Sequence, residues 1–413
     1  MLKAIGVFVA LVWASSINAQ SSAEKMQIEF HTFWRTQGER DALQSLVESI
    51  EPLNIDVNVV ESPSYNDLRY EISKRIGLGY PPEITHWLGG EDLETVVRDG
   101  LTFLDPGFAD KKQLRDKIHP EVLSKITVGE HIYAIPVGIH LQSSIIYNMA
   151  RLKQVGVTTI PKTWDELADL NSKLQASGEM AYAGTSEPWV LLELFNGILA
   201  SIGQRAAIHA LHGEFDPDGK LLEQLEAAMF QFLELVRISD SESNGRNWAD
   251  MVKMVIDGEA AYTIIGDYAW SEINTHSVGD LSTYKCAGLP GLHSAYFGTD
   301  IFVAFETSLP GWREQYGNLL DAILEEEAQY RYLQKKGGIS VVKNLDPAGL
   351  NPCSKASLER WNLDPNERFS SPGTRGKNST ALISSILVQT WENPSISAKV
   401  AAELMYNTVE RGQ

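Results

Sequence analysis

Aromatic side chains and acidic or imidazole side chains recur together where strands are expected to end and helices to begin. The aromatic members are Trp34, Trp87, Trp189, Trp248, Tyr268 and Trp270, and the polar members are Glu39, His86, His140, Asp267 and Asp300. Aromatic faces pack on the apolar C–H patches of pyranose rings, and charged acceptors form the stronger hydrogen bonds to hydroxyl groups. For any single tryptophan, core packing is at least as good an interpretation. The set as a whole predicts a site for a sugar.

The sequence lacks the motifs of the common enzyme classes. It contains no GxSxG, P-loop, HExxH or dinucleotide fingerprint, and no organised nucleophile–base pair. The carboxylates of "GGEDLE" could mimic a glycosidase pair, but acids at a helix start are favoured by the helix dipole. No CxxC occurs, and the spacing of His209 and His212 is typical of an incidental helix face. We expect a binding protein that is not an enzyme and has no metal or cofactor; a secreted sugar hydrolase is the enzyme alternative.

Length and charge restrict the class of protein further. With 413 residues the chain exceeds what one hydrophobic core usually serves, so two domains are expected. A net charge of −19 argues against nucleic acid and against an anionic membrane surface as partners. Cys286 and Cys353 are the two cysteines, and both a disulfide and two free thiols are compatible with the sequence.

The N-terminus has the layout of a secretory signal peptide over residues 1–19. A lysine precedes an apolar run from Ala4 to Ala14, and small Ala19 offers a cleavage point. The run is too short for a permanent membrane span, and no cysteine follows it to carry a lipid. We therefore expect export by the signal peptide and a periplasmic location.

Strand and helix patterns alternate from about residue 27 to residue 100. This βαβαβα order predicts a parallel α/β sheet, in which ligands sit beyond the carboxyl ends of the strands. The region from about 150 to 280 is mostly helical, with Thr163 and Glu166 as a capping box. Residues 312–338 have a continuous helical pattern.

The chain resembles the extracellular solute-binding proteins, family 1, of ABC sugar importers, and among them the glucose/mannose-binding type. The resemblance covers roughly residues 27 to 410 and is carried by "FWRTQGERDAL", "IGLGYPPEITHW", "GEHIYAIPVGIH", "PKTWDEL", "GEAAYTIIGDY", "LPG" and "GTDIF". Several of these motifs are weak alone, but their order is jointly specific. It implies an α/β, two-lobed periplasmic binding protein fold with hinge strands and an interlobe ligand cleft.

The resemblance also implies lobe boundaries. The N-terminal lobe would comprise residues 27–136 plus about 302–340, and the C-terminal lobe about 137–301 plus 341–413. The strand "YAIPV" would be the first crossing between lobes, with Pro136 ending the strand ladder at the hinge and His140 lining the cleft just after it.

By the same matching, a set of residues would contact the ligand. These are Trp34, Arg35, Glu39, His86, Leu88, His140, Trp248, Tyr268, Gly298, Asp300, Lys336 and Arg375. Asp300 would be the main carboxylate acceptor, and Lys336 a donor to a hydroxyl group. Arg375 is the weakest match because the loop before it differs in length.

The implied function is capture of a glucose-like monosaccharide or a small oligosaccharide, and its delivery to an inner-membrane ABC permease by a monomeric protein. Arg35 stands where glucose binders tend to carry a second tryptophan, Leu88 where they carry histidine, and Tyr268 where tryptophan is usual. Because Lys336, Arg35 and Arg375 would make the cleft more cationic, a uronate or sugar acid is the alternative ligand. A ligand reporter for a membrane sensor is the alternative role.

Overall fold

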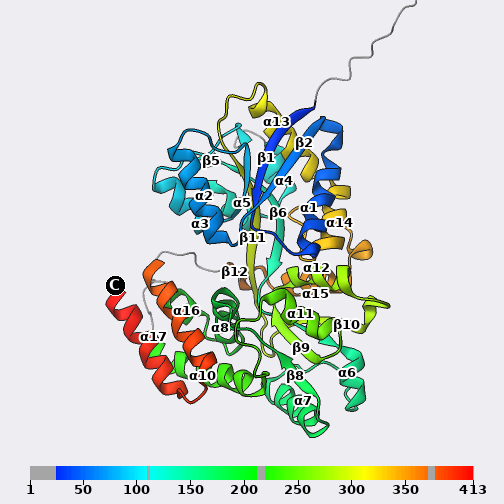
Figure 1. The fold of residues 1–413 in the computed structure, drawn as a ribbon, viewed down its shortest axis with the longest axis vertical. Coiled ribbons are helices and arrows are strands. Elements are labelled where there is room, and N and C mark those ends of the chain that lie inside the picture. Colours follow the sequence, from blue (N-terminus) through cyan, green and yellow to red (C-terminus); the bar gives the residue numbers. More distant parts are fainter. Residues whose placement is uncertain (1–24, 109–111, 212–218, 371–376, 413) are drawn as a thin grey trace, which may run out of the picture.

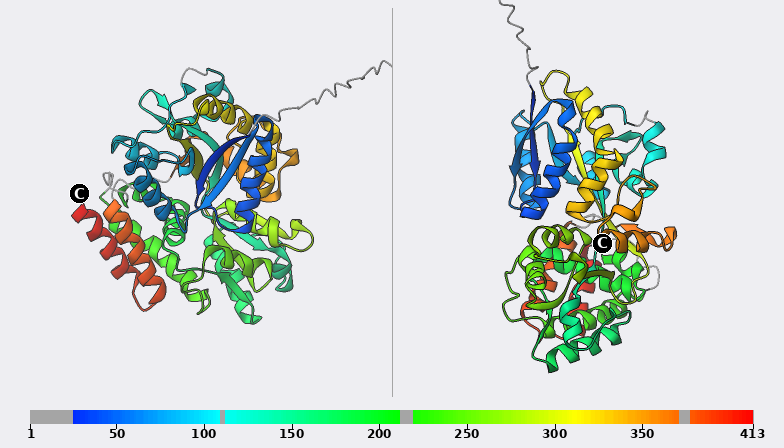
Figure 2. Two further views of the ribbon diagram at one scale, coloured as in Figure 1. Left: turned by 45° about the horizontal axis from the view of Figure 1, so that its top comes forward. Right: turned by 90° about the vertical axis from the view of Figure 1, so that its right-hand side faces the viewer.

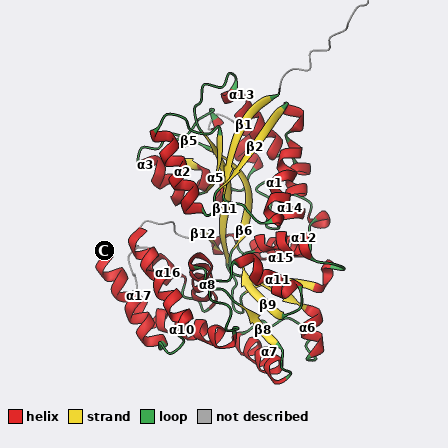
Figure 3. Cartoon of the chain, viewed as in Figure 1, coloured by secondary structure: helices red, strands yellow, loops and turns green. Residues whose placement is uncertain are grey.

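The computed structural model describes residues 25–108, 112–211, 219–370 and 377–412. The chain forms two lobes, each with its own β-sheet, and helices pack against both sheets (Figures 1 and 3). The predicted signal segment, residues 1–19, lies outside the described residues. No helix in the described ranges is long and apolar enough to cross a membrane.

The N-terminal lobe is built on a sheet whose strands run in the order β12-β11-β3-β1-β2, with β6 paired to β11. Strands β1, β2 and β3 are parallel, as the alternating pattern predicts. The strands are β1 (Met26–Thr32), β2 (Ile55–Glu61), β3 (Ile84–Leu88), β6 (Ala134–Leu141), β11 (Ala295–Ala304) and β12 (Arg368–Ser370), with the small hairpin β4 (Thr127–Val128) and β5 (His131–Ile132). The helices are α1 (Gln37–Ser49), α2 (Tyr65–Gly77), α3 (Glu91–Arg98), α4 (Lys112–Lys117), α5 (Pro120–Ile126), α13 (Trp312–Ile323) and α14 (Glu326–Lys336).

The C-terminal lobe has a sheet in the order β10-β7-β9-β8. Its strands are β7 (Ser144–Asn148), β8 (Met180–Ala183), β9 (Ala260–Ile265) and β10 (Tyr284–Gly288). Its helices are α6 (Met149–Gln154), α7 (Trp164–Ala176), α8 (Pro188–Ser201), α9 (Arg205–Leu211), α10 (Leu221–Ile238), α11 (Trp248–Ile256), α12 (Trp270–His276), α16 (Lys377–Glu392) and α17 (Ala398–Gly412), with the 3-10 turn η3 (Asp267–Ala269). Helix α15 (Pro352–Trp361) lies at the junction of the lobes (Figures 1 and 2).

Two local predictions need correction. Residues 312–338 contain two helices, because Glu325, at the N-cap position of α14, has an extended backbone that interrupts the helix. The acidic first turn of α14 suits the helix dipole. At α7 the Thr163 side chain accepts from the Glu166 N–H as expected, but the Glu166 carboxylate accepts from the N–H of Lys162 instead of that of Thr163.

Pro136 does not end the strand that contains it. The ladder between β6 and β11 continues to Leu141, so the expectation of a break at the proline is wrong. Among the described strands β6 pairs with β11 alone, and its register shifts beside Asp300, opposite the proline. Edge strands and bulges are where a missing N–H donor is tolerated. The chain leaves the sheet near Ser143, whose φ of 55° marks a sharp turn.

The buried apolar side chains form separate clusters. One cluster surrounds the N-terminal sheet and includes residues of β6, β11, α13 and α14, while two others surround the C-terminal sheet. The lobe boundaries predicted near 137 and 301 fall inside β6 and β11. We propose that the chain passes between lobes just beyond these strands, near residues 142–143 and 292–294.

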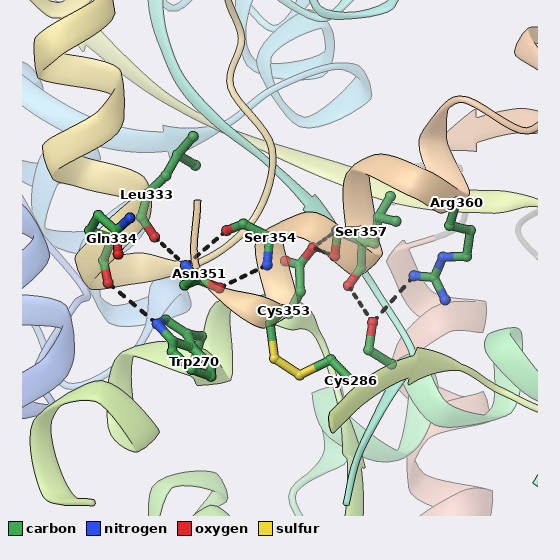
Figure 4. The surroundings of a disulfide bond; sticks show 12 residues. Trp270, Cys286, Leu333, Gln334, Asn351, Cys353, Ser354, Ser357 and Arg360 are labelled. Atoms are coloured by element: carbon green, nitrogen blue, oxygen red, sulfur yellow. Dashed lines mark hydrogen bonds between the residues drawn. A yellow bond between two sulfur atoms is a disulfide. The ribbon is translucent and has the colours of Figure 1, made fainter. Parts of the chain in front are cut away.

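Cys286 and Cys353 form a disulfide between β10 and α15 (Figure 4). The two residues are separated by 67 positions in the sequence. Such a link restricts the unfolded chain and is worth about 2–4 kcal/mol of stability. The disulfide therefore resolves the alternative that the sequence left open, and it fixes α15 to the C-terminal sheet.

Candidate functional site

A line of ionisable side chains crosses three neighbouring strands of the N-terminal sheet. Nε2 of His86 on β3 lies 3.2 Å from Oδ1 of Asp300 on β11, and Nε2 of His140 on β6 lies 3.3 Å from Oδ2 of the same carboxylate. In the register, Phe302 faces His86 and Gly298 faces His140, so both imidazoles are diagonal neighbours of Asp300 on one face of the sheet.

Burial and hydrogen bonding act against each other on these groups. Burial favours a protonated carboxyl at Asp300, but hydrogen bonds from His140 and His86 outweigh it and hold the pKa of Asp300 well below its ordinary value. Burial also opposes the charging of His140, but its hydrogen bonds to Asp267 and Asp300 raise the pKa of His140 to about 9. At neutral pH the pair is therefore a carboxylate and an imidazolium.

The second nitrogen of His140 contacts the other lobe. Nδ1 of His140 lies 3.2 Å from Oδ1 of Asp267, which is fully buried in η3. The hydroxyl of Tyr332 on α14 lies 3.2 Å from Nε2 of His140. Gly338 has a φ of 88°, and a Cβ there would come within 2.6 Å of Nδ1 of His140, so the glycine of "KKGG" allows the chain to pass the imidazole.

Lys336 at the end of α14 places its ammonium between two aromatic rings. Nζ of Lys336 lies 4.7 Å from the ring centre of Trp34 and 5.5 Å from that of Tyr268, and 3.2 Å from Oε1 of Glu39. The Lys336 residue is only 1% exposed. Glu39 also stabilises the start of α1. Its Oε2 accepts hydrogen bonds from the backbone N–H groups of Arg35 and Thr36, and the bond from Thr36 completes the capping box of α1.

Aromatic rings of the C-terminal lobe gather around Tyr268. The ring of Trp248, the first residue of α11, lies 5.9 Å from that of Tyr268 in an edge-to-face arrangement, and the ring of Trp189 lies 6.3 Å from it. The Tyr268 hydroxyl donates to Glu193 on α8 at 3.1 Å. Burial raises the pKa of Glu193 to about 7, against the hydrogen bonds from the Ser143 N–H and from Tyr268.

The remaining predicted residues are placed differently. Leu88 and Gly298 lie beside the line of ionisable side chains, since Leu88 pairs with Asp300 and Gly298 with His140 in the strand register. Arg35 is exposed, and its guanidinium donates to the Pro63 carbonyl at 3.1 Å instead of joining the cluster. Arg375 lies outside the described residues.

The structure thus brings together most of the predicted set. The residues linked by these contacts or by strand pairing are Trp34, Glu39, His86, Leu88, His140, Trp248, Tyr268, Gly298, Asp300 and Lys336. Trp87 and Trp270 are core residues, 1% and 0% exposed. In the described ranges no group of His, Cys, Asp and Glu side chains could hold a metal ion. Hydrogen-bonding groups and aromatic faces at one junction suit a polar ligand with apolar patches.

The family is decided by comparison with known proteins. A model of the bacterial extracellular solute-binding proteins matches residues 38–281, more than half of the 413-residue chain. The chain belongs to this family. Proteins of this family bind solutes and are not enzymes, as the absence of catalytic motifs predicts.

Curated and solved relatives of this solute-binding protein are distant but cover most of its length. A "probable sugar-binding periplasmic protein" of Brucella suis is 24% identical over 364 residues, covering 86% of this chain and 85% of its own. A bacterial solute receptor described as preferring β-D-galactopyranose is 17% identical, with a TM-score of 0.73 over 94% of this chain and 98% of that one. A solute-binding protein in complex with raffinose is 16% identical, with a TM-score of 0.74 over 94% and 100%. These structures show that the chain has the α/β periplasmic binding protein fold.

Three members of the cluster were missed or left unassigned by sequence reasoning. Tyr332 lies one helical turn before Lys336, so the two share a helix face, a spacing that could have identified it. Glu193 is the single charged residue of apolar α8, which is a signal for a buried role. Asp267 stands out in the first aromatic–polar set, but nothing in the sequence says that it faces His140.

Proposed function

We propose that this solute-binding protein is the periplasmic sugar-binding component of an ABC importer. It captures a glucose-like monosaccharide or a small oligosaccharide between its lobes and delivers it to a membrane permease. The observation that carries the proposal is the Asp300 carboxylate, held by two imidazoles at the lobe junction. The ring of Trp34 lies beside the His86 imidazole, and the ring of Tyr268 lies beside the His140 imidazole. The names of the Brucella and raffinose-bound relatives support a sugar as the solute.

The residues of the site have different roles in sugar recognition. Asp300 and Glu39 are acceptors for sugar hydroxyls, His140 and Lys336 are donors, and Trp34, Tyr268 and Trp248 supply faces for the C–H patches of the ring. Because Lys336 sits between Trp34 and Tyr268, a pyranose that stacks there displaces its ammonium from the space between the rings. Binding in the closed form requires the lobes to open and close around the sugar.

Charge favours a neutral sugar over an acidic one. Glu39, Asp267 and Asp300 face this junction, and their negative charges are paired with Lys336 and His140. Arg35, one of the three cations on which the acidic alternative is based, donates to the Pro63 carbonyl instead of joining the cluster. A uronate would add a negative charge close to Asp300, so we expect neutral sugars to bind more tightly.

Calorimetric titration of the exported, purified protein tests this proposal. The ligands are glucose, galactose, mannose, short disaccharides, glucuronate and galacturonate. We expect saturable heat with one or two neutral sugars, and no chemical change in the recovered sugar. Tighter binding of a uronate would overturn the preference for neutral ligands, and heat without saturation for every member would contradict a site for small sugars.

Replacement of Trp248 by alanine is expected to weaken sugar binding by about 1 kcal/mol, the size of one aromatic contact. The side chain is half-buried, so the melting temperature should change little. Trp164 offers a matched control, since it is also a half-buried tryptophan that follows a side-chain cap at the start of a helix. Unfolding of Trp248→Ala with unchanged residual affinity would instead assign Trp248 to core packing.

A further inference from the structure

Helix α15 presents one buried face to the C-terminal lobe. Cys353, Ser357 and Arg360 follow one another at helical spacing and are 0%, 4% and 8% exposed (Figure 4). Each contacts a different element. Cys353 is bonded to Cys286 of β10, and Nη2 of Arg360 donates to Oγ of Ser144 on β7 at 3.2 Å. The disulfide and this hydrogen bond therefore fix both ends of the face against the C-terminal sheet.

The middle residue of this face reaches the candidate site. Oγ of Ser357 donates to Oδ2 of Asp267 at 2.6 Å, and the backbone N–H of Leu141 donates to the same oxygen at 3.0 Å. With Oδ2 held by two donors, Oδ1 is left facing Nδ1 of His140 at 3.2 Å. The orientation of the Asp267 carboxylate is thus set partly by a residue that does not touch His140.

Helix α15 is also attached to the other lobe. The side chain of Asn351, its N-cap, donates to the carbonyl of Leu333 on α14 at 2.8 Å (Figure 4). Trp361 at its last turn belongs to the core cluster of the N-terminal lobe, while Cys353 belongs to a cluster of the C-terminal lobe. A shift of α15 would therefore alter contacts in both lobes.

We propose that α15 is a positioning element of the sugar site: the Cys286–Cys353 disulfide anchors the helix, and Ser357 orients Asp267 so that Asp267 aligns His140 with Asp300. Ser357 is a positioning residue, because it acts on the site only through Asp267. The partner of one imidazole nitrogen fixes the orientation and protonation of the ring, which is how a distant hydroxyl can affect ligand contacts. The proposal rests on the proposed function for the roles of His140 and Asp300.

The protonation of His140 reports this alignment without any ligand. The imidazole contacts Asp267 from η3, Asp300 from β11 and the Tyr332 hydroxyl from α14. The ring of Tyr268 lies 5.9 Å from it, and Glu193 of α8 also interacts with its charge. The charge of Asp267 in turn acts on Arg360 of α15 and on Glu193 of α8, and His86 of β3 contacts Asp300. If Asp267 rotates away, His140 loses one of its two carboxylate partners, and its pKa falls toward the ordinary value.

The test is an NMR titration of the His140 ring protons in the sugar-free protein, assigned by their loss in His140→Gln. Ser357→Ala is expected to lower the titration midpoint by about one unit, and Ser357→Thr, which retains the hydroxyl, to restore it. Ser354→Ala is the matched control, because Ser354 is buried on the same helix but its hydroxyl contacts Asn351. An unchanged or raised midpoint in Ser357→Ala would overturn the proposal.

The disulfide is tested separately with the double variant Cys286→Ala, Cys353→Ala. Amide hydrogen exchange in residues 352–361 should become faster, and the His140 midpoint should fall as in Ser357→Ala. Unchanged exchange and an unchanged midpoint would show that the disulfide does not anchor the site. Because neither readout uses a sugar, a shifted midpoint together with no binding of any sugar in the calorimetric panel would refute the proposed function alone.

Discussion

Replacement of Asp300 by asparagine is expected to weaken sugar binding by about 2–3 kcal/mol, a factor of roughly 30 to 150 in the dissociation constant. The Asp300 carboxylate on β11 links side chains of two other strands, since one oxygen contacts His86 of β3 and the other contacts His140 of β6. Asparagine has nearly the same shape but carries no charge. It therefore loses the charge-assisted bonds to ligand hydroxyls, removes the carboxylate that His86 contacts, and leaves the His140 imidazolium without one of its two carboxylate partners.

The matched control for this variant is Asp105→Asn. Asp105 also pairs with an imidazole, that of His131 at 2.5 Å, but the histidine side chain is 58% exposed. Affinity should be unaffected there, because an exposed pair contributes little and lies away from the cluster. Calorimetry gives the affinities, and thermal unfolding at the same pH separates a loss of binding from a loss of folding. Equal affinities of wild type and Asp300→Asn would show that the carboxylate is not a ligand contact.

Stability is expected to fall as the pH rises from about 6.5 to about 9. The pKa of His140 is raised to about 9 in the folded protein, against an ordinary value of 6.5. A group whose folded pKa is raised stabilises the fold fully below its unfolded pKa, and this contribution disappears as the pH passes the folded pKa. The raised value corresponds to about 3 kcal/mol of unfolding free energy lost across this window.

Urea unfolding at a series of pH values measures this loss. In His140→Gln the pH dependence between 6.5 and 9 should largely disappear, although the variant is less stable throughout because Asp267 and Asp300 lose a partner. His119→Gln is the control, because burial lowers the pKa of His119 to about 4, so its contribution changes below pH 6.5. Glu193, with a pKa of about 7, changes its contribution mainly between 4.5 and 7. The same slope in wild type and His140→Gln would contradict the assignment.

The sequence predicts the elements between residues 27 and 100 closely, because the hydrophobic periodicity of each element is regular and glycine or proline residues mark the element ends. Prediction from the sequence fails where pairing between distant segments determines the local structure. Pro136 stays within its strand because β6 is an edge strand with a bulge, and the pairing of β6 with β11 involves residues more than 150 positions away. The helix break at Glu325 is a local event, but the helical pattern runs through it without interruption.

At the candidate site, the residue types could be predicted from the sequence, but the partners that each residue contacts could not. Asp300, His86 and His140 could be selected as chemically suitable, but their proximity depends on a diagonal relation across three strands that only the register supplies. Lys336 could be selected, whereas its position between Trp34 and Tyr268 depends on how the lobes meet. The sequence left the pairing of Cys286 with Cys353 open and gave no signal for the role of Ser357, because both depend on tertiary contacts of α15.

The central claim is that a sugar binds beside Asp300 at the junction of the lobes. The most direct test is a tryptophan fluorescence titration of wild type and Asp300→Asn in parallel with glucose, galactose, mannose and short disaccharides. Trp34 and Trp248 lie next to the candidate site, so a bound sugar should change the emission. We predict a saturable change in wild type that requires roughly 30- to 150-fold more sugar in the variant. No saturable change with any of these sugars, or identical curves for the two proteins, would contradict the account.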